Sequence, residues 1–186
     1  MAANQPSWPR QWLMTDERIG DRLWDAIDAL PESSGVVFRH YATPRDQRVA
    51  IAGRVAAICR DRRITLAIAR DAALARSLDA ALVHNPDGDP GMMPTSRAAH
   101  SAEEVRSAVG AGASLIFLSP LFSTRSHPGR EPLSRKEARR IVAACPVPVI
   151  ALGGMNRARF DELKSDGFYG WAGIDAWVAD EKAVTE

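Results

Sequence analysis

The feature that most constrains this chain is Leu115–Leu118, four consecutive apolar residues followed by a loop crowded with polar side chains. A short apolar run bounded by turn residues is typical of a strand buried on both faces of a parallel sheet. The loop, Ser119–Gly129, carries hydroxyls, the guanidinium of Arg125 and the imidazole of His127. Ligands of parallel sheets bind where loops leave the carboxyl ends of strands, so we expect this loop to form one wall of a site for an anion. A solvated polar loop is the alternative.

Seven further segments have the character of strands, and most are followed by apolar residues at helical spacing. Strand patterns that alternate with helical ones are typical of a parallel sheet in which each helix returns the chain to the next strand. Besides Leu115–Leu118, the predicted strands are Trp12–Met14, Gly35–Phe38, Ile64–Ile68, Ala80–Val83, Met92–Ala99, Pro146–Leu152 and Tyr169–Ile174.

Capping residues mark where several helices begin. Asp71, Ser101 and Asn156 each follow a predicted strand, and such side chains accept a hydrogen bond from a backbone amide in the first helical turn. Thr43 followed by Pro44 predicts a helix that Thr43 caps and in which Pro44 takes the first position, where its missing amide costs nothing.

This alternation predicts a small single-domain α/β fold, the (β/α)8 or TIM barrel, which is the closed arrangement of eight strand–helix units. At 186 residues the barrel would be below the usual size, and the short connection at residues 85–91 is where residues are saved. An open, doubly wound sheet is the competing architecture. We expect a loose N-terminal lead-in over residues 1–11, the barrel over residues 12–178 and a C-terminal tail over residues 179–186.

Composition narrows the range of partners. The chain has 24 basic and 23 acidic residues and a formal net charge of +1. It therefore lacks the electrostatic signature of a protein that binds nucleic acid or an anionic membrane. Cys59 and Cys145 have no metal-binding or redox spacing. Residues 1–11 show no secretory signal pattern, and no apolar run approaches the roughly 20 residues of a membrane span, so we expect a cytoplasmic protein.

Histidines lie where a barrel would place its chemistry. His40, His84 and His100 lie at the ends of predicted strands, and His127 lies in the loop after another. In a barrel these positions are on the face that carries the active site. Because histidine exchanges protons near neutral pH, we expect an acid–base function for some of them, although any single one could be a hydrogen-bonded structural residue.

Other strand ends carry features suited to an anion. Gly153 and Gly154 lie between a predicted strand and a helix, where a backbone without side chains can approach a phosphate closely. In barrels, phosphate sites are often built from the loops after the last two strands, and Gly173 with Ile174 would supply the other half. Arg39 is a candidate anion clamp. The alternatives are a simple tight turn and a surface arginine.

A metal site has little support in the sequence. Magnesium requires carboxylate ligands at strand ends. Asp71, Asp87 and Asp89 lie near such ends, but they form no convincing pair and are better explained as cap and turn residues. We therefore expect no metal ligand and no cofactor.

Several short motifs follow the pattern of one known family. Ser119–Gly129 looks like a Gly-Pro-x-Phe-x-Thr-x-Thr-Lys loop, and Ala151–Met155 is similar to an Ala-Ile-Gly-Gly-Ile segment. His100–Glu104 resembles a Ser-x-His-x-x-x-Glu element. Leu13–Asp16 looks like an opening Leu-x-Thr-Asp, and Ala81–His84 resembles Gly-Val-His-Leu. In matching order from about residue 12 to residue 177, these motifs together resemble those of the thiamine phosphate synthase and thiazole tautomerase superfamily.

The resemblance implies a (β/α)8 barrel that binds a small phosphorylated thiazole or pyrimidine and forms homo-oligomers. The synthase joins a pyrimidine diphosphate to a thiazole phosphate and releases pyrophosphate with the help of magnesium. The tautomerase isomerises a thiazole carboxylate phosphate by acid–base chemistry without metal. His100 and His127 are the candidate catalytic residues. The candidate substrate-binding residues are Arg39, His84, Thr124, Ser126, Gly153, Gly154, Gly173, Ile174 and Asp175.

Departures from the family pattern concentrate in the part of the site that handles pyrophosphate and magnesium. Tyr41 stands where the synthase has Lys, and Arg70 stands where it has a magnesium-binding Asp. Ala98 and His127 replace a Ser and a Lys. Asp175 replaces a Ser of the phosphate loop and would repel phosphate if it faced the pocket.

These departures favour a tautomerase-like enzyme of thiamine biosynthesis, with His100 as the proton shuttle. Two alternatives stay open. One is a genuine synthase with relocated ligands that uses Asp71 or Asp87 to bind magnesium, in which case magnesium is a cofactor. The other is a non-catalytic barrel that serves as a ligand-binding or regulatory protein.

Overall fold

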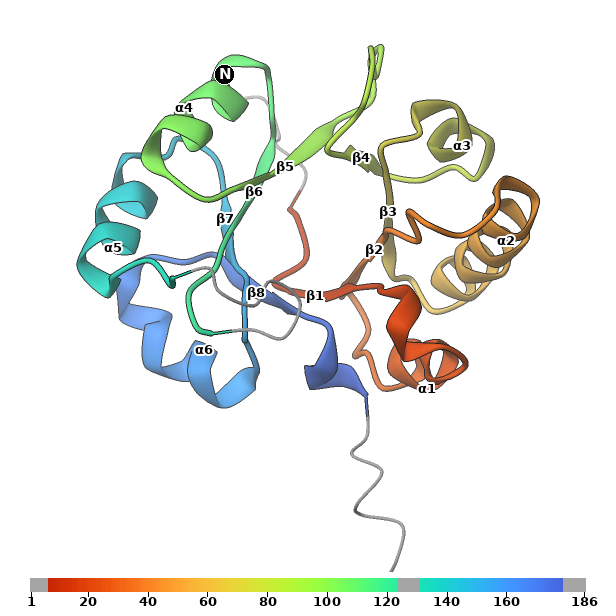
Figure 1. Cartoon of the computed structure of the whole chain (residues 1–186), viewed down its shortest axis with the longest axis horizontal. Helices are drawn as coiled ribbons and strands as arrows, with labels where there is room; N and C mark the ends of the chain where they lie inside the picture. Colours follow the sequence, from red (N-terminus) through yellow and green to blue (C-terminus); the bar gives the residue numbers. More distant parts are fainter. Residues whose placement is uncertain (1–6, 124–130, 179–186) are drawn as a thin grey trace, which may run out of the picture.

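The chain folds into a closed barrel of parallel strands, as a computed structural model of residues 7–123 and 131–178 shows (Figure 1). Each strand pairs with its neighbours along the chain, and β1 also pairs with β8. The predicted (β/α)8 barrel is therefore confirmed, and this closure excludes the open sheet. The strands are β1 (Gln11–Met14), β2 (Gly35–Phe38), β3 (Thr65–Ala69), β4 (Leu82–His84), β5 (Thr95–Ala99), β6 (Leu115–Leu118), β7 (Val149–Ala151) and β8 (Gly170–Gly173).

Helices surround the barrel (Figure 1). Asp71, Ser101 and Asn156 cap α3, α4 and α6 as predicted, each accepting a hydrogen bond from the amide three residues further on. Among the described residues, no helix combines the length and apolar character that crossing a membrane requires. The helices are η1 (Glu17–Ile19), α1 (Arg22–Asp28), α2 (Arg45–Asp61), α3 (Ala72–Ser77), α4 (Ala102–Gly110), α5 (Arg135–Ala144), α6 (Arg157–Leu163), η2 (Lys164–Asp166) and η3 (Asp175–Trp177).

The start of α2 differs from the prediction. Pro44 is the N-cap residue, and the helix begins at Arg45. Thr43 makes no cap because its hydroxyl and amide donate to the Glu17 carboxylate, over 2.9 and 2.7 Å. The amide of Ala42 donates to the same oxygen. Burial raises the pKa of Glu17, but the hydrogen bonds from Thr43 and Ala42 outweigh it and leave the pKa lowered. Glu17 thus ties the loop after β2 to the loop after β1.

Prolines explain two strands that are shorter than predicted. β5 begins at Thr95 rather than Met92, and β7 begins at Val149 rather than Pro146. Pro94 and Pro148 directly precede these strands, and proline has no amide to donate to a neighbouring strand. The connection from β4 to β5 is a loop without a helix, and it lies between α3 and α4 (Figure 1).

Strand residues alternate between the inside of the barrel and the helices outside. Val36 and Phe38 pack against the helix layer, whereas Val37 between them faces the interior. Inside, the rings of Trp12 and Phe117 meet edge to face, with centroids 5.5 Å apart. Outside, α1–α3 and α4–α6 cover two separate apolar clusters. The interior strand residues are Trp12, Met14, Val37, Ala67, Leu82, Leu115, Phe117, Ile150 and Ala172.

Residues 7–11 pack against the barrel, which differs from the loose lead-in expected over residues 1–11. Trp8 is buried in the interior cluster, and its indole N–H donates to the carbonyl of Ser114 over 3.1 Å. The indole of Trp12 donates to the carbonyl of Pro9. This segment therefore closes the amino end of the barrel. Residues 1–6 and the expected tail, residues 179–186, lie outside the described residues.

We predict opposite effects of two Gly→Ala substitutions. A Cβ at Gly35 would overlap the indole of Trp12, so Gly35→Ala should lower the free energy of unfolding by about 1–3 kcal/mol. A Cβ at Gly53, within α2, would meet no atom within 4 Å, so Gly53→Ala should raise it by about 0.5–1 kcal/mol. Urea denaturation of both variants measures the difference, and equal effects would contradict this packing of the interior.

Candidate active site at the carboxyl end of the barrel

Candidate site residues from five strands meet at the carboxyl end of the barrel. Arg39 follows β2, His84 ends β4 and His100 follows β5. Gly153–Gly154 follows β7, and Gly173–Asp175 ends β8 and begins η3. This end carries the active site in barrel enzymes. Three further predicted residues, Thr124, Ser126 and His127, lie outside the described residues.

Arg39 is held in place by the end of β1. Its amide donates to the hydroxyl of Thr15 over 2.9 Å, and its Nε donates to the Thr15 carbonyl over 2.7 Å. Its Nη2 lies 3.2 Å from a carboxylate oxygen of Asp16. Burial lowers the pKa of Arg39, although that pKa stays far above neutrality for any arginine in a protein. Arg39 is therefore a fixed cation whose charge Asp16 partly offsets.

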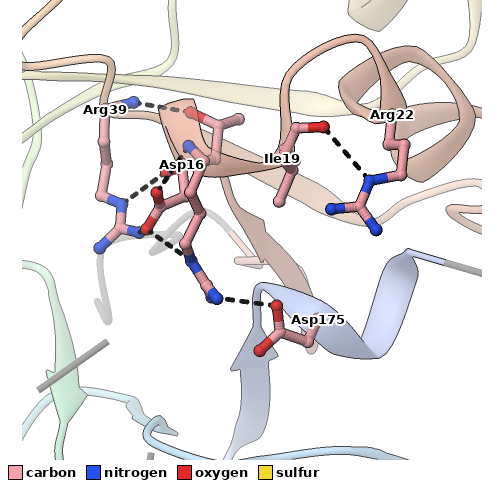
Figure 2. A network of polar contacts seen from close by, with 7 residues as sticks. Asp16, Ile19, Arg22, Arg39 and Asp175 are labelled. Atoms are coloured by element: carbon pink, nitrogen blue, oxygen red, sulfur yellow. Dashed lines mark hydrogen bonds and ion pairs between the residues drawn. The ribbon is translucent and has the colours of Figure 1, made fainter. Parts of the chain in front are cut away.

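The pair of Arg39 and Asp16 belongs to a longer chain of alternating charges. Figure 2 shows Asp16 beside Arg39, and Asp175 on a separate element. Arg18 links them, with Nε 3.4 Å from Asp16 and Nη2 3.0 Å from Asp175. The network connects the ends of β1, β2 and β8. Sequence reasoning missed Arg18 and named Asp16 only as the end of the Leu13–Asp16 motif, because pairs between distant loops leave no local pattern.

His100 has a defined orientation. Its Nδ1 lies 2.7 Å from the carbonyl oxygen of Ser119 and 3.1 Å from the Ser119 hydroxyl. A carbonyl oxygen can only accept a hydrogen bond, so Nδ1 carries the proton and Nε2 of the neutral ring carries the lone pair. The amide of His100 donates to Glu104 over 2.8 Å, which fixes the backbone at the start of α4. His100 is half-buried at this end of the barrel.

His84 has the contacts of a core residue. It is 1% exposed, and its ring meets Phe117 edge to face at 5.2 Å. Its Nδ1 lies 3.0 Å from the hydroxyl of Ser96. Burial, with smaller contributions from Arg39 and Arg97, lowers the pKa of His84 to about 3. His84 is therefore neutral at physiological pH, below the level of His100 in the barrel.

His40 lies on the helix side of the barrel wall, away from the other histidines. Its ring stacks on Phe38, with centroids 4.6 Å apart, and both ring nitrogens are buried without a hydrogen-bond partner in the described structure. Arg48 of α2 donates to its carbonyl. Burial lowers the pKa of His40. The expectation that the strand-end histidines share one face therefore does not hold for the His40 ring.

The Gly153–Gly154 turn is shaped by the neighbouring loop. Both glycines have positive φ, and a Cβ on Gly153 would come within 2.7 Å of Pro120. The Gly153 carbonyl accepts a hydrogen bond from Phe122, whereas neither glycine amide donates to an acceptor among the described residues. A Cβ on Gly173 would lie 3.1 Å from the carbonyl of Met155, so the loops after β7 and β8 are adjacent. Two amides and two adjacent loops make this place suitable for an anion.

Asp71 and Asp87, which the alternative synthase would use to bind magnesium, already contact other groups. One oxygen of Asp71 accepts the amide of Leu74 over 2.8 Å, and the other lies 3.6 Å from Arg48. Asp87 lies 3.8 Å from Nε of Arg70. Within the described residues, no three His, Cys, Asp or Glu side chains are grouped to hold a metal ion. These side chains therefore do not fit a magnesium site.

We predict that His84 makes stability pH-dependent. The unfolded chain binds a proton near pH 6.5 but folded His84 only near pH 3, so stability is complete above pH 6.5 and falls as the pH drops. Between pH 7 and pH 5, wild type should lose about 2 kcal/mol more than His84→Gln, which keeps a partner for Ser96 but does not titrate. Urea denaturation at both pH values measures this, and equal losses would contradict it.

Comparisons with known proteins agree with the fold. The family model described as thiamine monophosphate synthase matches residues 13–177. A thiamine-phosphate synthase from Prochlorococcus marinus is 28% identical over 159 residues, covering 78% of this chain and 45% of that protein. One from Salinispora arenicola is 40% identical over 83 residues, covering 44% and 38%. The chain thus spans less than half the length of either relative.

A solved structure gives the same result for the fold. Thiamine phosphate pyrophosphorylase from Pyrococcus furiosus superposes with a TM-score of 0.79, covers 92% of this chain and 89% of its own, and is 21% identical. At that identity the likeness shows the barrel fold. The family model, however, extends from β1 to η3 and includes every strand end described above. This chain therefore belongs to the thiamine monophosphate synthase family.

Proposed function

We propose that this protein acts in thiamine biosynthesis, in the cytoplasm, as an acid–base isomerase of a phosphorylated thiazole carboxylate. The observation that carries the proposal is the orientation of His100. The Ser119 carbonyl holds its Nδ1 proton and leaves the Nε2 lone pair available as a general base. An isomerisation by proton transfer needs no metal, which agrees with the engagement of Asp71 and Asp87 by other groups.

The proposed reaction moves one proton and one double bond. Nε2 of His100 takes a proton from a ring carbon of the substrate, and the exocyclic double bond shifts into the ring as the exocyclic carbon takes a proton back. The hydrogen bond from Nδ1 to Ser119 stabilises the imidazolium formed between the two steps. Arg39 binds the substrate carboxylate, sharing its charge between that group and Asp16.

The substrate phosphate is assigned to the adjacent loops after β7 and β8. The Gly153 and Gly154 amides would donate to it, with Gly173 and Ile174 forming the opposite wall. Thr124, Ser126 and His127 would orient the ligand from the loop after β6, with His127 as the second acid–base group. Asp175 brings a negative charge to this place, and its ion pair with Arg18 offsets part of the repulsion.

The family relationship favours one alternative function, that of a thiamine-phosphate synthase. The relatives are named thiamine-phosphate synthases, and a synthase would join a pyrimidine diphosphate to a thiazole phosphate with magnesium. That reaction would require Asp71 or Asp87 to give up its present partners. Pyrophosphate release with both substrates and magnesium at about 1 per second would establish the synthase and overturn the isomerase.

We predict that His100→Ala lowers kcat for the isomerisation by about 100- to 10,000-fold, because it removes the general base. Ser119→Ala is the matched control, since it removes the hydroxyl at 3.1 Å but keeps the carbonyl that orients the ring, and it should cost less than about tenfold. Circular dichroism checks the fold of both variants. If wild type isomerises no thiazole carboxylate phosphate, the proposed function is wrong. If His100→Ala is as fast as wild type, His100 is structural.

We predict that Asp175→Ser tightens binding of a thiazole phosphate about fivefold. The substitution removes a negative charge from this place, and one unit charge at about 4 Å in water is worth about 1 kcal/mol. Asp161→Ser is the control because it makes the same charge change on α6, where Asp161 pairs with Arg157 and Lys164. Calorimetric titration with a thiazole phosphate measures the affinity of wild type and both variants. Equal affinities for the three proteins would mean that the phosphate does not bind near Asp175.

A further inference from the structure

Two residues at the ends of β2 and β3 form a stacked pair on the rim of the barrel mouth. The guanidinium of Arg70 lies 4.4 Å from the centroid of the Tyr41 ring. Both side chains face solvent, since Arg70 is 54% exposed and Tyr41 is 44% exposed. A cation over an aromatic face keeps its charge and its N–H donors at the edge, so the stack presents an oriented cation to a ligand.

The backbone of Arg70 is strained. Its φ of 69° is in the left-handed region, which residues with long side chains rarely occupy and which glycine and asparagine adopt more readily. The conformation is maintained because the Arg70 amide donates to the carbonyl of His84 over 2.8 Å. The Arg70 carbonyl also accepts a hydrogen bond from the amide of Asp87. These two hydrogen bonds fix the backbone from which the Arg70 side chain leaves the rim beside the candidate site.

The charges around the stack favour an anion. The carboxylate of Asp71 faces Arg45 and Arg48, at 3.9 and 3.6 Å, and that of Asp87 lies 3.8 Å from Arg70. Three arginines therefore face two aspartates, and both aspartates are already paired. A divalent cation would meet this excess of positive charge, whereas an oxyanion would be attracted to it.

The stack also adjoins the candidate active site. Burial raises the pKa of Tyr41, and the positive charges of Arg39 and Arg70 oppose that rise. The hydroxyl of Tyr41 thus lies within electrostatic reach of both arginines. In the closed barrel, β3 and β7 lie on opposite sides, so this rim faces the Gly153–Gly154 turn across the mouth.

We propose that Arg70, stacked on Tyr41, is a second oxyanion subsite that binds a phosphate or carboxylate group directly, without a divalent cation. The guanidinium edge donates paired hydrogen bonds to the oxyanion, and the Tyr41 ring holds the guanidinium plane in position. The inference concerns binding alone and does not depend on the isomerisation proposed above. A ligand with an anionic group at each end would span the mouth from this subsite to the Gly153–Gly154 turn.

The test is a titration of isotopically labelled protein with inorganic pyrophosphate in the presence of EDTA, followed by NMR. The Arg70 side-chain Nε–H signal should shift and saturate in wild type. Arg70→Asn, which replaces the cation by a residue that adopts positive φ readily, should weaken the transition seen at neighbouring signals by about tenfold or more. Tyr41→Phe keeps the ring and should retain binding, whereas Tyr41→Ala should weaken it.

Arg76→Ala is the matched control, because Arg76 lies at the far end of α3, where its side chain donates to the Pro90 carbonyl. It makes a comparable change in net charge and should bind pyrophosphate as wild type does. The proposal is wrong if the Arg70 signal of wild type does not move, if Arg70→Asn binds as tightly as wild type, or if Arg76→Ala weakens binding as much as Arg70→Asn. It is also wrong if wild type binds only after magnesium is added. None of these results depends on isomerase activity, so the two proposals fail separately.

Discussion

Pairing of β1 with β8 is the constraint on which the rest of this structure depends. It aligns Trp12 with Ala172 and Leu13 with Gly173, and it closes the sheet. Closure leaves an interior of limited width, which Trp12 fills against Gly35 and Phe117. Once the sheet is closed, the strand ends are brought to one mouth, and residues from distant parts of the chain face one another there.

Ion pairs also connect the ends of β1, β2 and β8 at the barrel mouth. Arg39, Asp16, Arg18 and Asp175 alternate in charge and bind the ends of β2, β1 and β8 (Figure 2). Exposed ion pairs contribute little to stability individually, but Arg39 is largely buried and also donates to Thr15. The network therefore serves chiefly to hold Arg39 in one orientation at the barrel mouth.

The sequence predicted the fold well because the barrel repeats a local pattern. Apolar runs and caps such as Ser101 depend on neighbours in sequence, and the structure confirms them. Interactions between distant segments were missed. The contact of Thr43 with Glu17 moved the start of α2, and the burial of Trp8 extended the barrel towards the N-terminus. Contacts of this kind join residues far apart in the sequence, so no local sequence pattern predicts them.

The candidate site was predicted in part. Strand ends correctly placed Arg39 and His100 at the mouth, since position after a parallel strand decides which end a residue lies at. The direction of each side chain was harder to predict. His40 follows β2 by two residues, yet its ring lies against the helix layer, and His84 is enclosed in the interior. Both directions continue the alternation along the strand, since His40 is two residues after Phe38, which faces the helices, and His84 is two residues after Leu82, which faces the interior.

The proposed function depends on metal-free proton transfer at His100. The most direct measurement is to incubate the protein with a thiazole carboxylate phosphate in deuterated water containing EDTA, and to follow the product by mass spectrometry and NMR. Proton transfer through His100 should give an aromatic product with one deuterium on the exocyclic carbon, because the proton bound to His100 exchanges with solvent. Failure to form that product, or its formation only after magnesium is added, would contradict this mechanism.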